Sequence, residues 1–480
     1  MSRNLKTFAL AVLLITFFGL IQINQTPLFS DEAYYCHISE QFSQSSFFYN
    51  WNLAVNQFFV APLVLIVQGF SLKITPSQVS PIAACRSVSV FAGAISAFAI
   101  YLLMKELTKN RFTQLAAGFF VLLNPFSFFA NRTSLQEPTM VAFVSLTTYL
   151  LVKSKRNFRL FIAALITFGL AFLSKITALI ALPGMLWLSF RSAGNQVWQK
   201  QIPKTLLLIV TVTIMFFWSY QYTNLWDVVG YHTNKDVNLA QVTKRFWTNM
   251  HLSKSWYQQY LTPLFFVSAL LGSWQLFKKK QYQWLFFLAS IIILSAISVD
   301  SYFPRFLLIT LPFWAIIIGF STKYRIGKLV LALMLVVYAI NDWKIVYSPA
   351  AAKLASEDYF QFYQDWTSGK GVRSALGFVS LNSTPIFLLV PADLSYSFRL
   401  QQKSYYPDAE IEFIVISDRE TLSSLAKTDD SSNMLIAITS HHNWLRQLAE
   451  SEFNLEQIYS THDQTSKSVH LFKLKPKIQY

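Results

Sequence analysis

Charged residues are scarce in this chain of 480 residues. Only 13% are Asp, Glu, Lys or Arg, whereas an ordinary soluble domain has about 25%. Acids are the scarcest, because residues 1–346 contain nine of them against 28 bases, while residues 347–480 hold the other 15 acids and 12 bases. The shortage of charge argues against a purely soluble protein, and its uneven distribution divides the chain into an apolar body and a polar tail.

Cysteine is also rare, and Cys36 and Cys85 are the only two. Two thiols provide no disulfide framework, no Cys-x-x-Cys motif suggests a metal or redox site, and the compartment cannot be read from cysteine usage. The net charge of +16 could suggest nucleic acid. However, the bases lie in short clusters between apolar runs, as in loops that orient membrane helices. We therefore expect membrane lipids, and no nucleic acid, as partners.

Long apolar runs, by contrast, are abundant. A helix needs about 20 mostly apolar residues to cross a bilayer, and we interpret eleven runs as spans. The stretch 158–190 is too long for one span, so we expect two short ones that meet at Lys175. The eleven spans are 8–23, 82–104, 112–130, 138–152, two within 158–190, 203–222, 260–277, 282–299, 303–320 and 327–347.

The run at 58–72 is ambiguous, because about 15 residues could cross the bilayer or lie in its interface. If this run does not cross, 18 bases lie in inner loops and ten outside, whereas a crossing would invert every later basic loop. The positive-inside tendency favours the first arrangement. We therefore expect an interfacial or re-entrant segment, a cytoplasmic N-terminus, and an outward position for eight of the nine acids in the body.

From about Ala350 the composition becomes that of a soluble domain. Strand-length apolar runs alternate with polar helical candidates, which is typical of a small α/β layer. We expect strands at 385–390, 412–416, 434–438 and 469–474, and helices at 358–366 and 419–426. The predicted fold class is mainly α: a polytopic membrane helical bundle of about 11 transmembrane helices (residues 1–348, outer loops 24–80 and 223–257) with a small C-terminal extracytoplasmic α/β domain (residues 349–480).

Four outward segments carry the ionisable residues that could do chemistry. Each also has a simpler interpretation: an acid that complements a helix N-terminus, a lysine that snorkels to the headgroups, or an interfacial arginine anchor. Their common side of the membrane favours one chemical picture, in which acids abstract a proton and cations meet an anionic leaving group. The segments are Ser30-Asp31-Glu32-Ala33-Tyr34-Tyr35, Arg132-Thr133-Ser134-Leu135-Gln136-Glu137-Pro138, Leu173-Ser174-Lys175-Ile176-Thr177 and Tyr302-Phe303-Pro304-Arg305-Phe306-Leu307.

These segments, in this order and spacing, resemble those of the protein O-mannosyltransferase and aminoarabinose transferase group, family thirty-nine of the GT-C glycosyltransferases. The resemblance covers about residues 5–320. It includes Leu-Pro-Gly after the Lys175 motif and Pro-Arg-Phe-Leu-Leu-Ile-Thr-Leu-Pro at 304–312. Downstream, Asp365-Trp366-Thr367-Ser368-Gly369-Lys370-Gly371-Val372 resembles a segment of bacterial members. The resemblance implies a multi-pass GT-C enzyme of the plasma (inner) membrane, with its active site and C-terminal domain outside the cytoplasm.

The resemblance also implies roles for particular residues. The enzyme would move a sugar, a hexose or a pentose, from a polyprenyl-phosphate donor to a protein hydroxyl, lipid or glycan, with inversion. Asp31 would be the general base, and Glu32 and Glu137 would position the donor or acceptor. Lys175 and Arg305 would neutralise the phosphate leaving group. We expect substrate-positioning roles for Tyr34, Tyr35 and His232.

Some features depart from the family pattern. Phe306 stands where the family usually has Tyr, eleven spans are fewer than in the aminoarabinose transferases, and the 223–257 loop contains no β-trefoil-like insert. His232 and His251 lack metal-ligand spacing, so we assign no metal site, although a divalent metal cofactor stays open. Two other functions also stay open: a transporter or flippase of lipid-linked glycans, which would favour duplicated halves, and a non-catalytic membrane scaffold.

Overall fold

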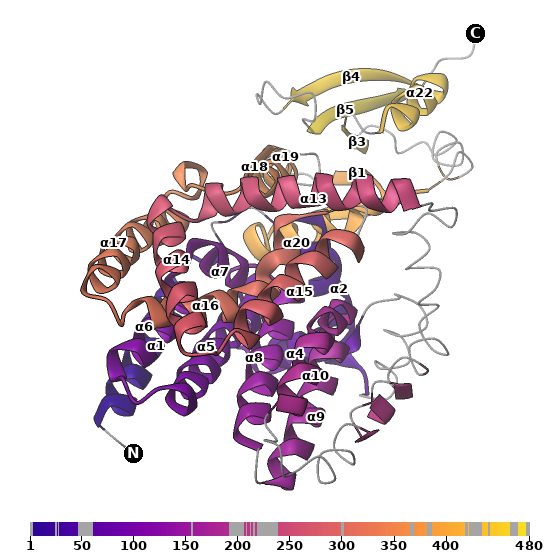
Figure 1. Ribbon diagram of the computed structural model, residues 1–480. Coiled ribbons are helices and arrows are strands. Elements are labelled where there is room, and N and C mark those ends of the chain that lie inside the picture. Colours follow the sequence, from indigo (N-terminus) through magenta and orange to yellow (C-terminus); the bar gives the residue numbers. More distant parts are fainter. Residues whose placement is uncertain are drawn as a thin grey trace.

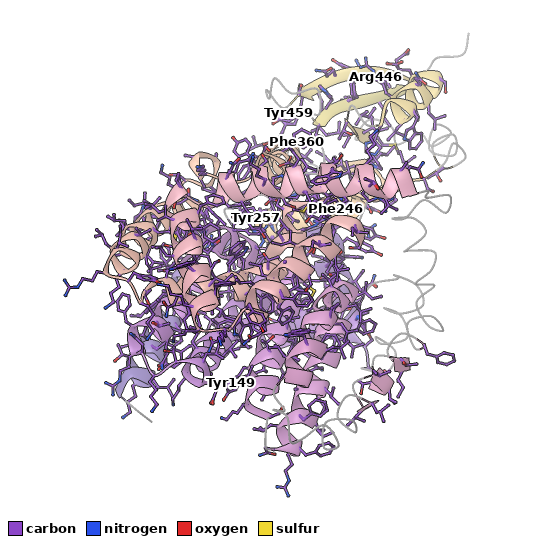
Figure 2. All side chains as sticks on the ribbon, viewed as in Figure 1. Tyr149, Phe246, Tyr257, Phe360, Arg446 and Tyr459 are labelled. Atoms are coloured by element: carbon purple, nitrogen blue, oxygen red, sulfur yellow. A yellow bond between two sulfur atoms is a disulfide. The ribbon has the colours of Figure 1, made fainter. Side chains whose placement is uncertain are left out.

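A helical body and a small sheet make up the protein (Figure 1). The computed structural model describes residues 3–480 with gaps. These gaps are Gln25, Pro27, 47–60, 155–156, 192–205, parts of 208–217, 218–238, 299–301, 365–368, 382–385, 418–420, 422–433, 440–441, 461–468 and 477–480. The helices of the body are packed around one large apolar core, and side chains fill the space between them (Figure 2).

The first half of the body contains the helices that carry three of the four motifs. Polar caps define where several of them begin, because a side-chain oxygen of Ser80, Asn110, Asn124 or Asn157 accepts a backbone N–H of the first turn. The elements are α1 (Arg3–Leu20), α2 (Ser30–Gln44), α4 (Pro62–Ile74), α5 (Pro81–Leu107), α6 (Arg111–Leu123), α7 (Pro125–Asn131), α8 (Glu137–Lys153), α9 (Phe158–Ser174), the 3-10 helix η2 (Ile176–Ala181) and α10 (Leu182–Arg191).

The second half begins with a polar helix that turns sharply into an apolar one. α13 (Leu239–Tyr260) and α14 (Pro263–Lys278) meet at 111°, and Pro263 begins the second helix because its fixed φ suits a first turn. The elements that follow are α15 (Gln283–Ser298), the 3-10 helix η3 (Pro304–Thr310), α16 (Leu311–Ser321), α17 (Arg325–Tyr347), η4 (Pro349–Ala351), α18 (Ser356–Tyr359) and the π-helical turn η5 (Phe360–Gln364).

The apolar runs predicted as spans coincide with these helices, except that 203–222 falls largely outside the described residues. By length and composition, three described helices could each cross a membrane: α5, the continuous η3–α16 unit and α17. The bent pairs α6–α7 and α13–α14 raise the number to five, and several other apolar helices are shorter. The ambiguous run at 58–72 contains α4, a helix of 13 residues.

Hydroxyl groups join the central helices of the body. Ser96 of α5 and Ser145 of α8 lie 2.9 Å apart, and Thr147 of α8 donates to Thr167 of α9 at 2.9 Å. Small hydroxyl residues let membrane helices approach closely and also satisfy each other's polar atoms. This packing brings the start of α5, the start of α8 and the end of α9 together, which is where the motifs lie.

The C-terminal region forms a mixed five-stranded sheet of order β2-β1-β3-β5-β4. β1 pairs in parallel with β2 and β3, while β5 is antiparallel to β3 and β4. Its elements are α19 (Gly369–Val379), β1 (Ile386–Pro391), α20 (Ala392–Tyr405), β2 (Ile411–Ile416), β3 (Met434–Thr439), α22 (Asn443–Glu452), β4 (Phe453–Ser460) and β5 (Val469–Pro476).

Four predicted strands are confirmed, whereas β4 was not predicted. Its sequence, FNLEQIYS, carries polar residues on a half-exposed edge strand, so it lacks the apolar run that marks the others. The helix predicted at 358–366 is present as α18 and η5 up to Gln364, and the helix predicted at 419–426 falls almost entirely outside the described residues.

The two cysteines require a correction. Sequence analysis found no disulfide framework, but Cys36 of α2 and Cys85 of α5 form a disulfide across 49 positions. Both are buried beside Leu400 of α20. The pairing depends on the packing of α2 against α5, which cysteine spacing does not reveal.

Candidate active site

Four charged side chains from distant parts of the chain meet at the end of the bundle where α2 and α8 begin. Nη2 of Arg305 lies 3.1 Å from Oδ2 of Asp31, and Nε of Arg305 lies 3.6 Å from Oε1 of Glu137. Lys175 forms a salt bridge with the same Glu137 oxygen. We call these four residues the charge cluster. It contains two carboxylates and two cations, so its charges balance within the protein.

Local structure explains why each member points into the cluster. Asp31 and Glu137 lie in the first turns of α2 and α8, where a negative charge complements the helix N-terminus. Lys175 lies in extended backbone at the break between α9 and η2. Arg305 follows Pro304 at the start of η3. The ends and breaks of four membrane elements therefore bring the four side chains together.

The members of the charge cluster differ in accessibility. The side chain of Asp31 is 37% exposed, that of Lys175 is 19% exposed, that of Arg305 is 15% exposed and that of Glu137 is only 2% exposed. Asp31 is therefore the carboxylate that a molecule from outside can reach. Glu137 is enclosed and holds the two cations in place.

Aromatic rings line the cation side of the cluster. The Arg305 guanidinium lies 5.3 Å from the ring centre of Phe29 and 5.0 Å from that of Phe303. The Lys175 ammonium lies 4.9 Å from the ring centre of Phe306. Cation–π contacts of this kind stabilise a cation without neutralising it. The Phe at 306, where the resembling family usually has Tyr, thus provides a ring beneath Lys175 without a phenol group.

Glu32, predicted to share the site, lies apart from the charge cluster. Its carboxylate binds Arg86 of α5 at 3.0 and 2.9 Å, and both side chains are fully buried. It also accepts the backbone N–H of Ser134 at 2.6 Å and that of Phe29 at 3.1 Å. Arg86 in turn donates to two carbonyl oxygens of the loop after α1, at 2.7 and 3.0 Å. Glu32 therefore joins α2 to α5 and to the loop that leads to Glu137.

Sequence analysis missed Arg86 and did not give Arg132 a role. Arg132 is buried and donates to backbone carbonyls at the end of α1, among them those of Ile21 at 2.9 Å and Gln22 at 3.0 Å. One signal could have identified Arg86: it lies within an apolar helix of 27 residues. An ionisable residue within such a helix needs a partner.

The two predicted tyrosines lie beside the charge cluster. Burial, followed by the nearby Asp31, raises the pKa of Tyr35. Burial and the neighbouring Tyr396 raise the pKa of Tyr34 to about 12. Both phenols are therefore neutral at pH 7. The third predicted positioning residue, His232, lies outside the described residues.

Within the described ranges, no group of three His, Cys, Asp or Glu side chains is placed to hold a metal ion. The charge cluster contributes only two carboxylates, and both already face cations.

Comparisons with known proteins identify the fold. Residues 60–220 match the family described as dolichyl-phosphate-mannose-protein mannosyltransferase. ArnT from Cupriavidus metallidurans bound to undecaprenyl phosphate has a similar structure, with a TM-score of 0.58 and 13% sequence identity over 98% of this chain and 97% of that one. The protein has a GT-C fold. The resemblance inferred from the four motifs and the predicted membrane bundle are thereby confirmed.

The apo state of the same ArnT gives a TM-score of 0.55 and 12% identity over 98% of this chain and 97% of that one. Among curated proteins, no sequence matches this chain. Because identity is so low, the structural similarity establishes the fold alone. The protein, which has this fold, is a membrane protein.

Proposed function

We propose that this GT-C protein is a membrane glycosyltransferase that transfers a sugar from a polyprenyl-phosphate donor to an acceptor outside the cytoplasm. The observation that carries the proposal is the charge cluster, in which one accessible carboxylate lies beside two cations at the outer end of the bundle. An ArnT of the same fold binds undecaprenyl phosphate. Both features suit a lipid donor whose phosphate must be neutralised as it leaves.

Asp31 acts as the general base in this proposal. The acceptor hydroxyl oxygen attacks the anomeric carbon and gives its proton to the Asp31 carboxylate, while the bond between that carbon and the phosphate oxygen breaks. The electron pair of the broken bond stays on the polyprenyl phosphate. Attack opposite the leaving group inverts the configuration at the anomeric carbon.

Lys175 and Arg305 stabilise the departing phosphate. Nε and Nη1 of Arg305 are buried and have no hydrogen-bond acceptor among the described residues. A phosphate beside Lys175 supplies oxygen acceptors to buried donors of this kind, because a guanidinium forms charge-assisted hydrogen bonds with phosphate. Such preorganised cations are worth most in a site shielded from water.

Donor binding also frees the base. Without donor, Arg305 holds Asp31 at 3.1 Å. Because the charge cluster is electrically balanced, the negative charge of an incoming phosphate competes with Asp31 for the guanidinium. Asp31 is then released toward the acceptor hydroxyl, and we expect donor to bind before acceptor.

The disulfide supports an extracytoplasmic site. Cys36 lies on α2, five residues from Asp31, and disulfides persist in oxidising compartments outside the cytoplasm. The positive-inside distribution leads independently to the same side. We propose a plasma membrane location, with the N-terminus in the cytoplasm and the charge cluster outside.

Transfer of radiolabelled mannose from undecaprenyl phosphate to cell-envelope acceptors by purified protein tests this function, with undecaprenyl-phosphate glucose as a second donor. We expect Asp31→Asn to lower the transfer rate by about 100-fold or more while undecaprenyl phosphate still binds. Glu106→Gln, a similar carboxyl-to-amide change at the other end of α5, should leave transfer unchanged. Full activity of a folded Asp31→Asn protein would contradict the role of the base.

A further inference from the structure

A row of aromatic rings leads from the charge cluster to the C-terminal domain. Tyr35 borders the cluster, since Asp31, Arg305 and Glu137 all act on its hydroxyl. The ring centre of Tyr34 lies 5.9 Å from that of Tyr35 and 5.6 Å from that of Tyr396 of α20. The Tyr396 ring in turn lies 4.7 Å from that of His37.

Contacts between the two domains hold these rings in place. α20 packs against α2 at the junction between the helical body and the sheet (Figure 1). Lys403 forms a 2.6 Å salt bridge with Glu40, and the Tyr405 hydroxyl donates to the Asn24 carbonyl at 2.7 Å. Leu400 is buried beside the disulfide. Tyr396 therefore has a defined position relative to Asp31, although 365 positions separate them in the chain.

The rings are accessible as well as ordered. Tyr34, His37 and Tyr396 are all half-buried, and Arg399 beside them is exposed. Burial lowers the pKa of His37, and the nearby Arg399 and Lys403 lower it further against the opposing effect of Glu40. The imidazole is thus neutral at pH 7. The surface presents apolar ring faces with hydroxyl and imidazole groups at their edges.

This surface suits a saccharide better than a peptide. One common mode of binding an extended peptide uses main-chain hydrogen bonds at a sheet edge, which α2 and α20 do not offer because they are helices whose backbone groups are bonded internally. A sugar ring instead offers C–H groups to an aromatic face and hydroxyls to polar groups at the ring edge, and an amphipathic aromatic side chain provides both. On α2, His37 lies about 9 Å along the helix axis from Asp31, and Tyr34 lies between them in the sequence.

We propose that Tyr34, His37 and Tyr396 form an acceptor subsite for a saccharide, shared between the helical body and the C-terminal domain. The description of this subsite as an acceptor subsite rests on the proposed function. The C-terminal domain then contributes directly to acceptor recognition. The saccharide can belong to a free glycan or to the headgroup of a glycolipid, because both present the same sugar chemistry.

Direct binding tests the subsite without donor. The full-length protein in nanodiscs is mixed with mannotriose, maltotriose or chitotriose, and saturation-transfer NMR detects which sugar protons contact it. We expect Tyr396→Ala to reduce the transferred signal at least fivefold and Tyr396→Phe to retain most of it. Tyr459→Ala is the matched control, because Tyr459 lies on β4 in the same domain, away from α2 (Figure 2).

Two further arms identify the acceptor. The trisaccharide that binds is also presented on a lipid in the nanodisc, and tighter binding of that form than of the free sugar indicates a glycolipid. A peptide rich in Ser and Thr serves as competitor. Its displacement of the sugar, an unchanged signal in folded Tyr396→Ala, or no binding of any of the three sugars to the wild type would overturn the proposal.

The outcome can be separated from that of the proposed function. Sugar binding requires neither donor nor transfer, so Asp31→Asn should retain it. Tyr396→Ala should raise the KM for acceptor at least fivefold and leave undecaprenyl phosphate binding unchanged. If sugar binds normally but no transfer occurs with any donor, the catalytic proposal fails while the subsite stands.

Discussion

Two carboxylates that are adjacent in the sequence have different partners in the structure. Asp31 and Glu32 are adjacent in the sequence, but successive residues of a helix are turned about 100° from each other. Asp31 consequently faces the charge cluster and is 37% exposed, whereas Glu32 faces α5 and is fully buried. Sequence analysis placed both in the site, and only Asp31 belongs to the charge cluster.

The buried pair makes a prediction about stability. Glu32→Gln leaves the Arg86 guanidinium buried without its counter-charge, so we expect a loss of about 3–5 kcal/mol in the free energy of unfolding. Glu450→Gln removes an exposed partner of Arg446 and should change stability by less than about 1 kcal/mol. Denaturant unfolding of the two purified variants measures the difference, and equal effects would contradict the structural role of Glu32.

At the scale of elements, the position of α2 determines the geometry of the site. This helix carries Asp31, and three kinds of contact hold it: the Glu32–Arg86 pair, the disulfide to α5 and the packing of α20. The linker after α17, which contains η4, α18 and η5, adds a further support. Phe362 of η5 packs against Phe29, with ring centres 5.3 Å apart, and Phe29 lies under the Arg305 guanidinium.

The disulfide should contribute measurably to this support. Opening the loop of 49 positions between Cys36 and Cys85 is expected to lower stability by about 2–4 kcal/mol. We therefore predict a lower midpoint of thermal unfolding when the protein is treated with a reductant. The double variant Cys36→Ala/Cys85→Ala should unfold at the lower midpoint whether or not reductant is present. If reductant lowered the midpoint of thermal unfolding of the double variant by the same amount, the decrease would have a cause other than this disulfide.

A buried carboxyl group in the linker, that of Asp358, should make the stability of the protein depend on pH. Burial raises the pKa of Asp358 in α18 to about 7, against smaller opposing effects of the Tyr260 hydrogen bond and Arg305. The folded protein therefore keeps a proton that the unfolded chain loses near pH 4. This stabilising effect is full below pH 4 and is lost as the pH rises through about 7, with a slope of at most about 1.4 kcal/mol per pH unit.

Asp358→Asn tests this dependence. Unfolding midpoints of the purified variant between pH 4.5 and pH 8 should fall less steeply with rising pH than those of the wild type. Asp408→Asn changes an exposed carboxylate in the C-terminal domain and should keep the wild-type profile. Parallel profiles for wild type and Asp358→Asn would show that another group titrates.

At the scale of the whole molecule, the arrangement places all the proposed chemistry at one end. The charge cluster, the disulfide and the docked α20 lie together at the end of the bundle that faces the sheet, while Tyr149 and Lys153 lie toward the opposite end of α8 (Figures 1 and 2). A membrane enzyme with a lipid donor and an external acceptor needs this polarity, because both substrates must meet at one membrane face.

Membrane orientation is directly testable. In the background Cys36→Ala/Cys85→Ala, we expect a single cysteine introduced as Ser380→Cys in the C-terminal domain to react with a membrane-impermeant maleimide in intact cells. A cysteine introduced as Lys279→Cys, in the basic loop between α14 and α15, should react only after the cells are permeabilised. The reverse pattern would invert the proposed topology.

The sequence alone determined the apolar helices, their expected orientation, four of the five strands and the four motifs that meet in the charge cluster. These features are local, since contact with lipid or burial in a sheet requires a run of apolar residues that a single segment displays. The tertiary structure alone decided that Cys36 pairs with Cys85, that Glu32 is buried against Arg86, and that Tyr396 lies beside Tyr34. Each of these contacts joins distant segments, and the packing of helices that brings them together leaves no periodic signal in either one.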